Sequence, residues 1–164
     1  MVSDNPYEEI EECERDLESL RESGDADPAN MDELLEYLGI LHAMVENFDT
    51  AIDYHEQQLE HGRQAGYRDG EREALSNLGA DHELAGRPDE AIEYFQKALT
   101  LAREMEQPES ICDQLAGLGR NYRQLDQPQR AIDYHRQAVE TARENRLSAV
   151  ECDALGGLAA AYSF

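Results

Sequence analysis

The stretch Ala-Ile-Asp-Tyr-His at residues 51–55 decides the fold, because it recurs as Ala-Ile-Glu-Tyr-Phe at 91–95 and as Ala-Ile-Asp-Tyr-His at 131–135. Both intervals are 40 residues long. A repeated unit of this length is one supersecondary structure, and it buries its apolar side only by stacking on neighbouring units. The chain is therefore predicted to be a repeat array, in which recurring residues build the scaffold and residues that break the period can carry a specific function.

Each period contains two amphipathic helical patterns separated by a short polar break. In the second period Leu75, Leu78 and His82 lie on one helical face, and the sequence Gly-Arg-Pro-Asp at 86–89 then interrupts the pattern. A second apolar stripe follows on the next helix. The same patterns predict an all-α chain of about eight helices without strands, at 6–23, 31–45, 49–64, 71–85, 91–102, 109–125, 129–145 and from 149 onward.

Two of these helices begin near residues with the spacing of a capping box. Asn30 stands three positions before Glu33, and Ser148 stands three positions before Glu151. In this motif the first side chain bonds a backbone N–H of the first turn, and the acidic side chain bonds back to the first residue. Asn30 and Ser148 are therefore predicted to cap their helices.

The repeat pattern covers almost the whole chain, and no interdomain linker interrupts it. We therefore expect a single array over 1–164. Its expected parts are an N-terminal capping helix with its loop at 6–28, three repeats at 29–68, 69–108 and 109–148, and a half repeat at 149–164.

The chain is strongly acidic, with 37 Asp and Glu against 14 Lys and Arg and a net charge of −23. Disorder is not expected, because 40% of the residues are hydrophobic and they recur at helical spacing. No basic stripe is available to neutralise phosphates, so nucleic acid is not an expected partner. Lys97 is the only lysine, and an acidic, lysine-poor surface suits molar salt. A halophilic, haloarchaeal source is expected, with an ordinary acidic surface from a GC-rich genome as the alternative.

The chain carries no sequence signal for a membrane or for export. It lacks a stretch of about 18 apolar residues, so neither a membrane span nor a membrane partner is expected. Its N-terminal residues do not follow the charged-then-apolar pattern of a signal segment. Three cysteines do not suggest a disulfide framework. A cytoplasmic location is therefore expected.

Two repeat positions alternate histidine with an aromatic residue, which is typical of a packed aromatic site in a core. No Cys/His spacing matches a zinc site, so neither a metal nor a cofactor is expected. Since no nucleophile–base pair or carboxylate dyad recurs at usable spacing either, we do not expect an enzyme. The two positions hold His42, His82, Tyr122 and Tyr162 in one case, and His55, Phe95 and His135 in the other.

The order of large and small residues within each period resembles the tetratricopeptide repeat. The third unit has Leu115, Leu118, Gly119 and Tyr122 along its first helix, and Ala131 begins the matching series on its second. This resemblance implies a right-handed α-solenoid of antiparallel helix pairs. The period of 40 residues exceeds the usual value of about 34, as in the extended repeats of kinesin light chains and bacterial peptide-sensing regulators. HEAT-type helix pairs are the alternative, but the Leu-Gly-x2-aromatic signature favours the tetratricopeptide repeat.

The resemblance also implies that the first helix of each pair lines a concave groove that binds a peptide or protein segment. Arg120 and Arg123 lie one helical turn apart on one face, so they are expected to anchor a carboxylate of the ligand. The alternative is a surface salt bridge to Asp113 or Glu83. By motif position the groove consists of Glu36, Tyr37, Ile40, Met44, Ser76, Asn77, Glu83, Arg120 and Arg123.

The last predicted helix is apolar and has no second helix after it to cover it. We expect it either to be followed by further repeats in a longer array or to form a homodimer face. The leading hypothesis for the whole chain is a non-catalytic scaffold for a protein or peptide partner, and the alternative is a homo-oligomerisation module of a larger signalling or regulatory protein. The face of the last helix consists of Val150, Leu155, Leu158, Tyr162 and Phe164.

Overall fold

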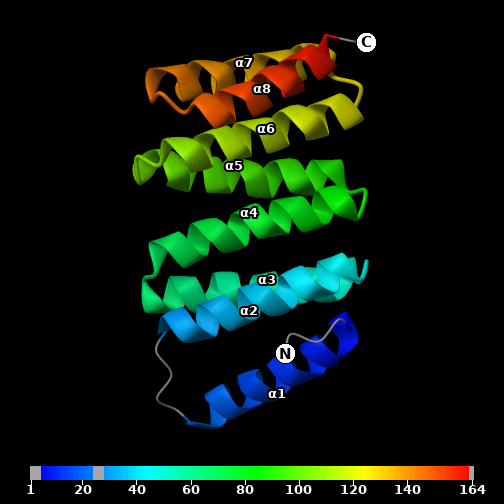
Figure 1. Cartoon of the computed structure of the whole chain (residues 1–164), viewed down its shortest axis with the longest axis vertical. Helices are drawn as coiled ribbons and strands as arrows, with labels where there is room; N and C mark the ends of the chain where they lie inside the picture. The colour runs from blue at the N-terminus through cyan, green and yellow to red at the C-terminus, as the bar shows by residue number, and fades with distance from the viewer. Residues whose placement is uncertain (1–4, 24–27, 163–164) are drawn as a thin grey trace. The chain divides into compact units, whose positions relative to one another are not determined.

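The computed structural model describes residues 5–23 and 28–162. Within these ranges all regular structure is α-helical, which confirms the predicted all-α class (Figure 1). Most of the expected loop at 24–28 lies outside the described residues, and so does Phe164. The helices are α1 (Pro6–Ser23), α2 (Pro28–Met44), α3 (Phe48–Ala65), α4 (Arg68–Leu84), α5 (Pro88–Glu104), α6 (Pro108–Gln124), α7 (Pro128–Glu144) and α8 (Ser148–Ala161).

The helices group into two compact units, Met1–Asp81 and His82–Phe164. The first unit holds α1, α2, α3 and most of α4, and the second holds the end of α4 and α5 to α8. Within each unit successive helices lie side by side and run antiparallel, as α2 with α3 and α6 with α7 show (Figure 1). The helices begin and end within three residues of the predicted ranges. A single array over 1–164 stays a prediction.

Each connection from α2 through to α8 uses the same left-handed turn, and the turns recur every 20 residues. In the turn after α3, the N–H of Tyr67 donates to the carbonyl oxygen of Gly62 at 2.8 Å, which is the long bond of a Schellman motif. Each of the other five turns makes the equivalent bond at 2.8–3.0 Å. The 40-residue unit is therefore built from two halves of equal length, each a helix and its turn. The residues with positive φ are Glu46 (60°), Gly66 (68°), Gly86 (72°), Glu106 (55°), Asp126 (56°) and Arg146 (60°).

The two predicted capping boxes are wrong, because the residues that were expected to cap these helices already lie within them. Pro28 is the first residue of α2, which places Asn30 inside the helix, and α5, α6 and α7 also begin with proline. Proline fixes φ at a helical value and has no N–H to leave unsatisfied, so it starts a helix well. In α8 the residue before the helix is Leu147, whose carbonyl oxygen accepts the N–H of Glu151 at 2.8 Å. Ser148 is thus already helical.

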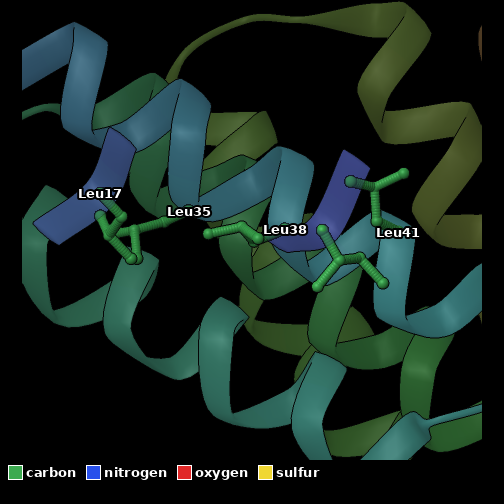
Figure 2. Packing of buried hydrophobic residues seen from close by; sticks show 5 residues of the cluster. Leu17, Leu35, Leu38 and Leu41 are labelled. Atoms are coloured by element: carbon green, nitrogen blue, oxygen red, sulfur yellow. The ribbon is translucent and has the colours of Figure 1, made fainter. Parts of the chain in front are cut away.

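The core of the first unit is an aliphatic cluster in which α1 packs against α2. Figure 2 shows Leu17 of α1 pointing toward Leu35 of α2, with Leu38 and Leu41 further along α2. These four side chains are buried, and Leu38 is completely shielded from solvent. Burying one leucine removes enough apolar surface to contribute about 1.5–3 kcal/mol, so this cluster helps to hold α1 to the unit.

In the second unit, glycine lets aromatic rings from neighbouring helices approach the backbone of α6. A Cβ atom added at Gly117 would lie 2.9 Å from the ring of Phe95 in α5. A Cβ atom added at Gly119 would lie 2.5 Å from Nε2 of His135 in α7. Both distances are too short for a real contact, so glycine at these positions is required by packing. Gly119 of the repeat motif, and Gly117 beside it, therefore let neighbouring helices approach closely.

Candidate binding surfaces

The first histidine position forms a stacked ring pair with a tyrosine of the following helix. His42 stacks on Tyr54 with ring centroids 5.3 Å apart and 19° between the planes. In the second unit His82 stacks on Tyr94 at 5.2 Å and 11°. Tyr122 makes the same pair with Tyr134 at 5.3 Å and 3°. Histidine and tyrosine thus make the same stacked pair here, which confirms that this position is an aromatic site, although Nε2 of His42 also lies 3.7 Å from Oε1 of Glu14.

The second histidine position is more than an aromatic site, because His55 has an acidic partner that the repeat pattern does not reveal. Its Nδ1 lies 2.6 Å from Oδ2 of Asp81, and the two side chains are only 2% and 4% exposed. Phe95, at the equivalent position, packs as a plain ring. One sequence feature could have pointed to this pair. Asp81 is acidic, and the equivalent residue in the next period is the buried Asn121.

His135, at the same repeat position in α7, lies in surroundings that disfavour its charged form. It is 3% exposed, and within the described residues its Nδ1 atom has no hydrogen-bond partner. Burial lowers the pKa of His135 from its ordinary value, and the positive charges of Arg120 and Arg123 lower it further. Among the residues that the structure describes, no group of three or more His, Cys, Asp or Glu side chains is placed to hold a metal ion.

In the first unit, several predicted groove residues lie together on α2 and α4. The amide nitrogen Nδ2 of Asn77 donates to Oε1 of Glu36 at 3.3 Å, so these two predicted residues meet. The hydroxyl of Tyr37 donates to Glu9 of α1, and this bond raises the pKa of Tyr37 above its ordinary value. Ser76 is half-buried on α4.

Three apolar residues of α2 remain exposed on one face, although α2 buries another face in the core. Tyr37 is 41% exposed, Ile40 is 39% exposed and Met44 is 71% exposed. Residues three and four positions apart share a helix face, so the three form one strip, which we call the α2 strip. An exposed strip of this kind is surface that the scaffold itself does not need.

In the second unit, Arg120 is held by Glu83 and is not an open anchor. Its Nε donates to Oε1 of Glu83 at 2.8 Å and its Nη2 donates to Oε2 at 3.0 Å, a bidentate pair. The bond to Glu83 raises the pKa of Arg120 above its ordinary value. Arg123 lies one turn further along α6 and is half-buried. The alternative of a salt bridge to Glu83 is thus what the structure contains, and any ligand carboxylate has to compete with it.

The outer face of α8 exposes part of the apolar surface predicted for it. Leu155 is 40% exposed and Tyr162 is 59% exposed, whereas Val150 and Leu158 are half-buried. The hydroxyl oxygen of Tyr162 accepts a hydrogen bond from Nη2 of Arg136 at 3.3 Å.

Comparison with solved structures supports the same helical-repeat fold. The chain is similar to BtubC (BKLC) from P. vanneervenii at 22% identity and a TM-score of 0.81, covering 98% of this chain and 66% of that one. It is similar to PH0952 from Pyrococcus horikoshii, a signal transduction ATPase with a tetratricopeptide repeat sensor, at 20% identity and a TM-score of 0.77, covering 98% of this chain and 27% of that one. A putative kinesin light chain from Podosopora anserina with nearly identical repeats gives 16% identity and a TM-score of 0.77, covering 96% and 77%.

These identities are low, so the likeness shows the fold alone. The chain spans less than two thirds of the length of BtubC and about a quarter of PH0952. Among curated proteins none matches the chain significantly. None of the described helices is both long and apolar enough to cross a bilayer.

Family models identify the repeat directly. Two models described as tetratricopeptide repeat match residues 30–104 and 114–148. The first match runs from near the start of α2 to the end of α5, and the second runs from the middle of α6 to the first residue of α8. Together they cover more than half of the chain, which therefore belongs to the tetratricopeptide repeat proteins.

Proposed function

We propose that the chain is a non-catalytic scaffold that binds a protein or peptide segment on the exposed faces of its first helices. The observation that carries this proposal is the α2 strip, in which Tyr37, Ile40 and Met44 are each at least 39% exposed on one helix face. A peptide that covers this strip buries apolar surface on a helix that is already held in place by the core, so the protein loses little conformational entropy on binding.

Polar groups beside the strip can orient such a segment. The pair of Glu36 and Asn77 lies on the same two first helices, α2 and α4, of the first unit. In the second unit, Arg123 and the Arg120–Glu83 pair offer charged groups on the equivalent helices. A ligand carboxylate would have to displace Glu83 from Arg120. It would therefore bind more weakly than at two arginines without a bound carboxylate.

The relatives support a recognition role. The tetratricopeptide repeat of PH0952 is described as a sensor, and the repeat fold is typical of protein-interaction scaffolds. The acidic, lysine-poor composition supports a halophilic source. A cytoplasmic location and the absence of nucleic-acid and membrane partners stay predictions.

The test is a selection of random peptides on the full chain, repeated with the variant Ile40→Glu/Met44→Glu. We expect peptides enriched on the wild-type protein to lose binding to this variant, because two charges replace the apolar strip. Tyr7→Glu is the matched control, since Tyr7 is 63% exposed on α1 and lies outside the strip. Equal binding to the wild-type protein and to the strip variant would rule out the α2 strip as the binding surface.

The second candidate is a homo-oligomerisation module, favoured by the exposed Leu155 and Tyr162 on α8. Light scattering over a range of concentrations would show a dimer that Leu155→Glu/Tyr162→Glu converts to a monomer. A wild-type protein that is monomeric at all concentrations would exclude this candidate.

A further inference from the structure

The first unit contains a shallow cavity between α1 and α2, largely open to solvent, that no repeat motif accounts for. Its volume is about 550 Å³, within the range of about 300–1,000 Å³ that ligand sites occupy. Two of its residues come from α1 and four from α2, where they are spaced three, four and seven positions apart and so form one face. The lining residues are Asp16, Leu20, Asn30, Glu33, Leu34 and Tyr37.

The floor of the cavity is apolar. Leu20 and Leu34 are half-buried, and the ring of Tyr37 stands beside them on α2. Surface of this kind covers the hydrocarbon part of a side chain and excludes water from it.

The rim of the cavity is acidic. Asp16 and Glu33 are exposed at its edge. Glu9 accepts a hydrogen bond from the hydroxyl of Tyr37, which also lines the cavity. None of the described lining residues is basic. The negative charge of the rim is therefore left for a ligand to neutralise.

The basic residues of α1 do not line this cavity, and each of them is hydrogen-bonded to another part of the protein. The helix has only two, Arg15 and Arg21. Nε of Arg15 donates to the carbonyl oxygen of Glu11, and Nη2 of Arg21 donates to Oε1 of Gln57 on α3 at 2.6 Å. The sequence of α2 contains neither arginine nor lysine.

We propose that this cavity binds a segment of a partner polypeptide in which arginine or lysine is flanked by apolar residues. The flanking residues and the aliphatic stem of the basic residue lie on the floor, and the charged end reaches the rim carboxylates or the face of the Tyr37 ring. Tyr37 also begins the α2 strip, so the same segment continues along α2 over Ile40 and Met44. The inference thus rests on the proposed peptide-binding function and names its ligand chemistry.

A second copy of this chain does not fit the cavity. The chain has a net charge of −23, so another copy would bring carboxylates against Asp16 and Glu33. Like charges at such a contact oppose association, whereas a basic partner is attracted from a distance.

The test uses fluorescence anisotropy of the full chain with labelled peptides that carry a central Leu-Arg-Leu, Leu-Gln-Leu, Leu-Glu-Leu or Gly-Arg-Gly. We expect Leu-Arg-Leu to bind best, and its affinity to fall between 0.05 M and 0.5 M salt, because exposed charges are screened. Equal affinity for Leu-Arg-Leu and Leu-Glu-Leu would overturn the charge claim. Equal affinity for Leu-Arg-Leu and Gly-Arg-Gly would overturn the claim about the apolar floor, and failure of Leu-Arg-Leu to bind would overturn the proposal as a whole.

Two double variants locate the site. Asp16→Asn/Glu33→Gln keeps the shape of the rim and removes its charge. We expect this variant to bind the Leu-Arg-Leu peptide about fivefold more weakly, or weaker still. Glu11→Gln/Glu18→Gln removes the same charge from residues that line a separate hollow on α1, and we expect a loss of about twofold or less. Equal losses would show that net charge alone attracts the peptide, which would overturn the proposal. Circular dichroism confirms that both variants are folded.

The two proposals fail in distinguishable ways. If Ile40→Glu/Met44→Glu abolishes peptide binding while Asp16→Asn/Glu33→Gln leaves it unchanged, the α2 strip stands and the cavity proposal falls. If Asp16→Asn/Glu33→Gln abolishes Leu-Arg-Leu binding and the strip variant does not, the cavity stands without the strip.

Discussion

His55 and Asp81 form a buried pair in the first unit, with Nδ1 and Oδ2 2.6 Å apart and both side chains almost completely shielded. They lie on different helices, α3 and α4, and are 26 positions apart in sequence. The pair therefore ties two neighbouring helices together through a contact that the repeat motif does not contain. A polar bond in a dry core is costly to break, because the group that remains is buried without a partner.

Removing one member of this pair should destabilise the protein. We expect Asp81→Ala to lower the free energy of unfolding by about 3 kcal/mol, since it leaves the buried ring of His55 without its partner. Asp81→Asn keeps an acceptor for Nδ1 and should cost about 1 kcal/mol. Urea denaturation measures both values, and a loss below about 0.5 kcal/mol for Asp81→Ala would contradict a structural role for the pair.

At the left-handed turn positions, introducing glycine and removing glycine should have opposite effects on the stability of the protein. Glu106 has a φ of 55°, which costs a non-glycine residue about 1–2 kcal/mol, so Glu106→Gly should stabilise the protein by about 0.5–1 kcal/mol. Gly86→Ala should destabilise it by about 1 kcal/mol, and only through the backbone, because an added Cβ meets no described atom within 4 Å.

Asp126→Gly is the control for this comparison, because Asp tolerates a left-handed φ of 56° better than Glu does. Its gain in thermal stability should be the smaller of the two. Unchanged melting temperatures for both Gly86→Ala and Glu106→Gly would show that the turns tolerate any residue.

The lowered pKa of His135 predicts a pH-dependent stability. Between the lowered value and the ordinary value of 6.5, the unfolded chain binds more protons than the folded one, so stability falls as the pH falls. His135→Phe removes this pH dependence. Repacking around the new ring also changes the free energy of unfolding, but by an amount that does not depend on pH. We expect the difference in unfolding free energy between wild type and variant to be constant above about pH 7 and to shift in the variant's favour in more acidic buffer. Urea titrations from pH 5 to 8 check this, and a difference that does not change with pH would contradict it.

The Arg120–Glu83 pair predicts how the second unit responds to acidic ligands. Glu83→Gln removes the negative charge and one of the two acceptors that hold Arg120, so binding of a peptide with a central Leu-Glu-Leu should become about threefold tighter. Glu90→Gln is the matched control, since it removes the same charge from an exposed residue at the start of α5. Equal affinities for the two variants, measured by anisotropy, would remove Arg120 from the list of binding residues.

The helices and their pairing could be predicted from the sequence, because apolar spacing and the Leu-Gly-x2-aromatic series depend only on local periodicity. The exchange of histidine with tyrosine between periods predicted an aromatic site at His42, but it did not identify Tyr54 as the ring on which His42 stacks. The helix starts could not be derived in the same way. Asn30 and Ser148 match the capping pattern, but Pro28 and the carbonyl of Leu147 begin their helices earlier.

The features that depend on contacts between helices were less accessible. His55 was interpreted as an aromatic ring because Phe95 holds the same repeat position, and nothing in that comparison points to Asp81 on another helix. The cavity between α1 and α2 depends on how two dissimilar helices approach, and α1 lies before the first of the three predicted repeats. The salt bridge from Arg120 to Glu83 was anticipated as an alternative, because both residues are charged and lie on first helices.

The most direct test of the central claim, that the scaffold binds a peptide on α2, is a ¹⁵N–¹H spectrum of the full chain titrated with a selected peptide. We expect the largest shift changes at Tyr37, Ile40 and Met44, with smaller changes at the neighbouring residues of α1 and α4. Changes confined to α8 around Leu155 and Tyr162, or absent from α2 at saturating peptide, would contradict the account.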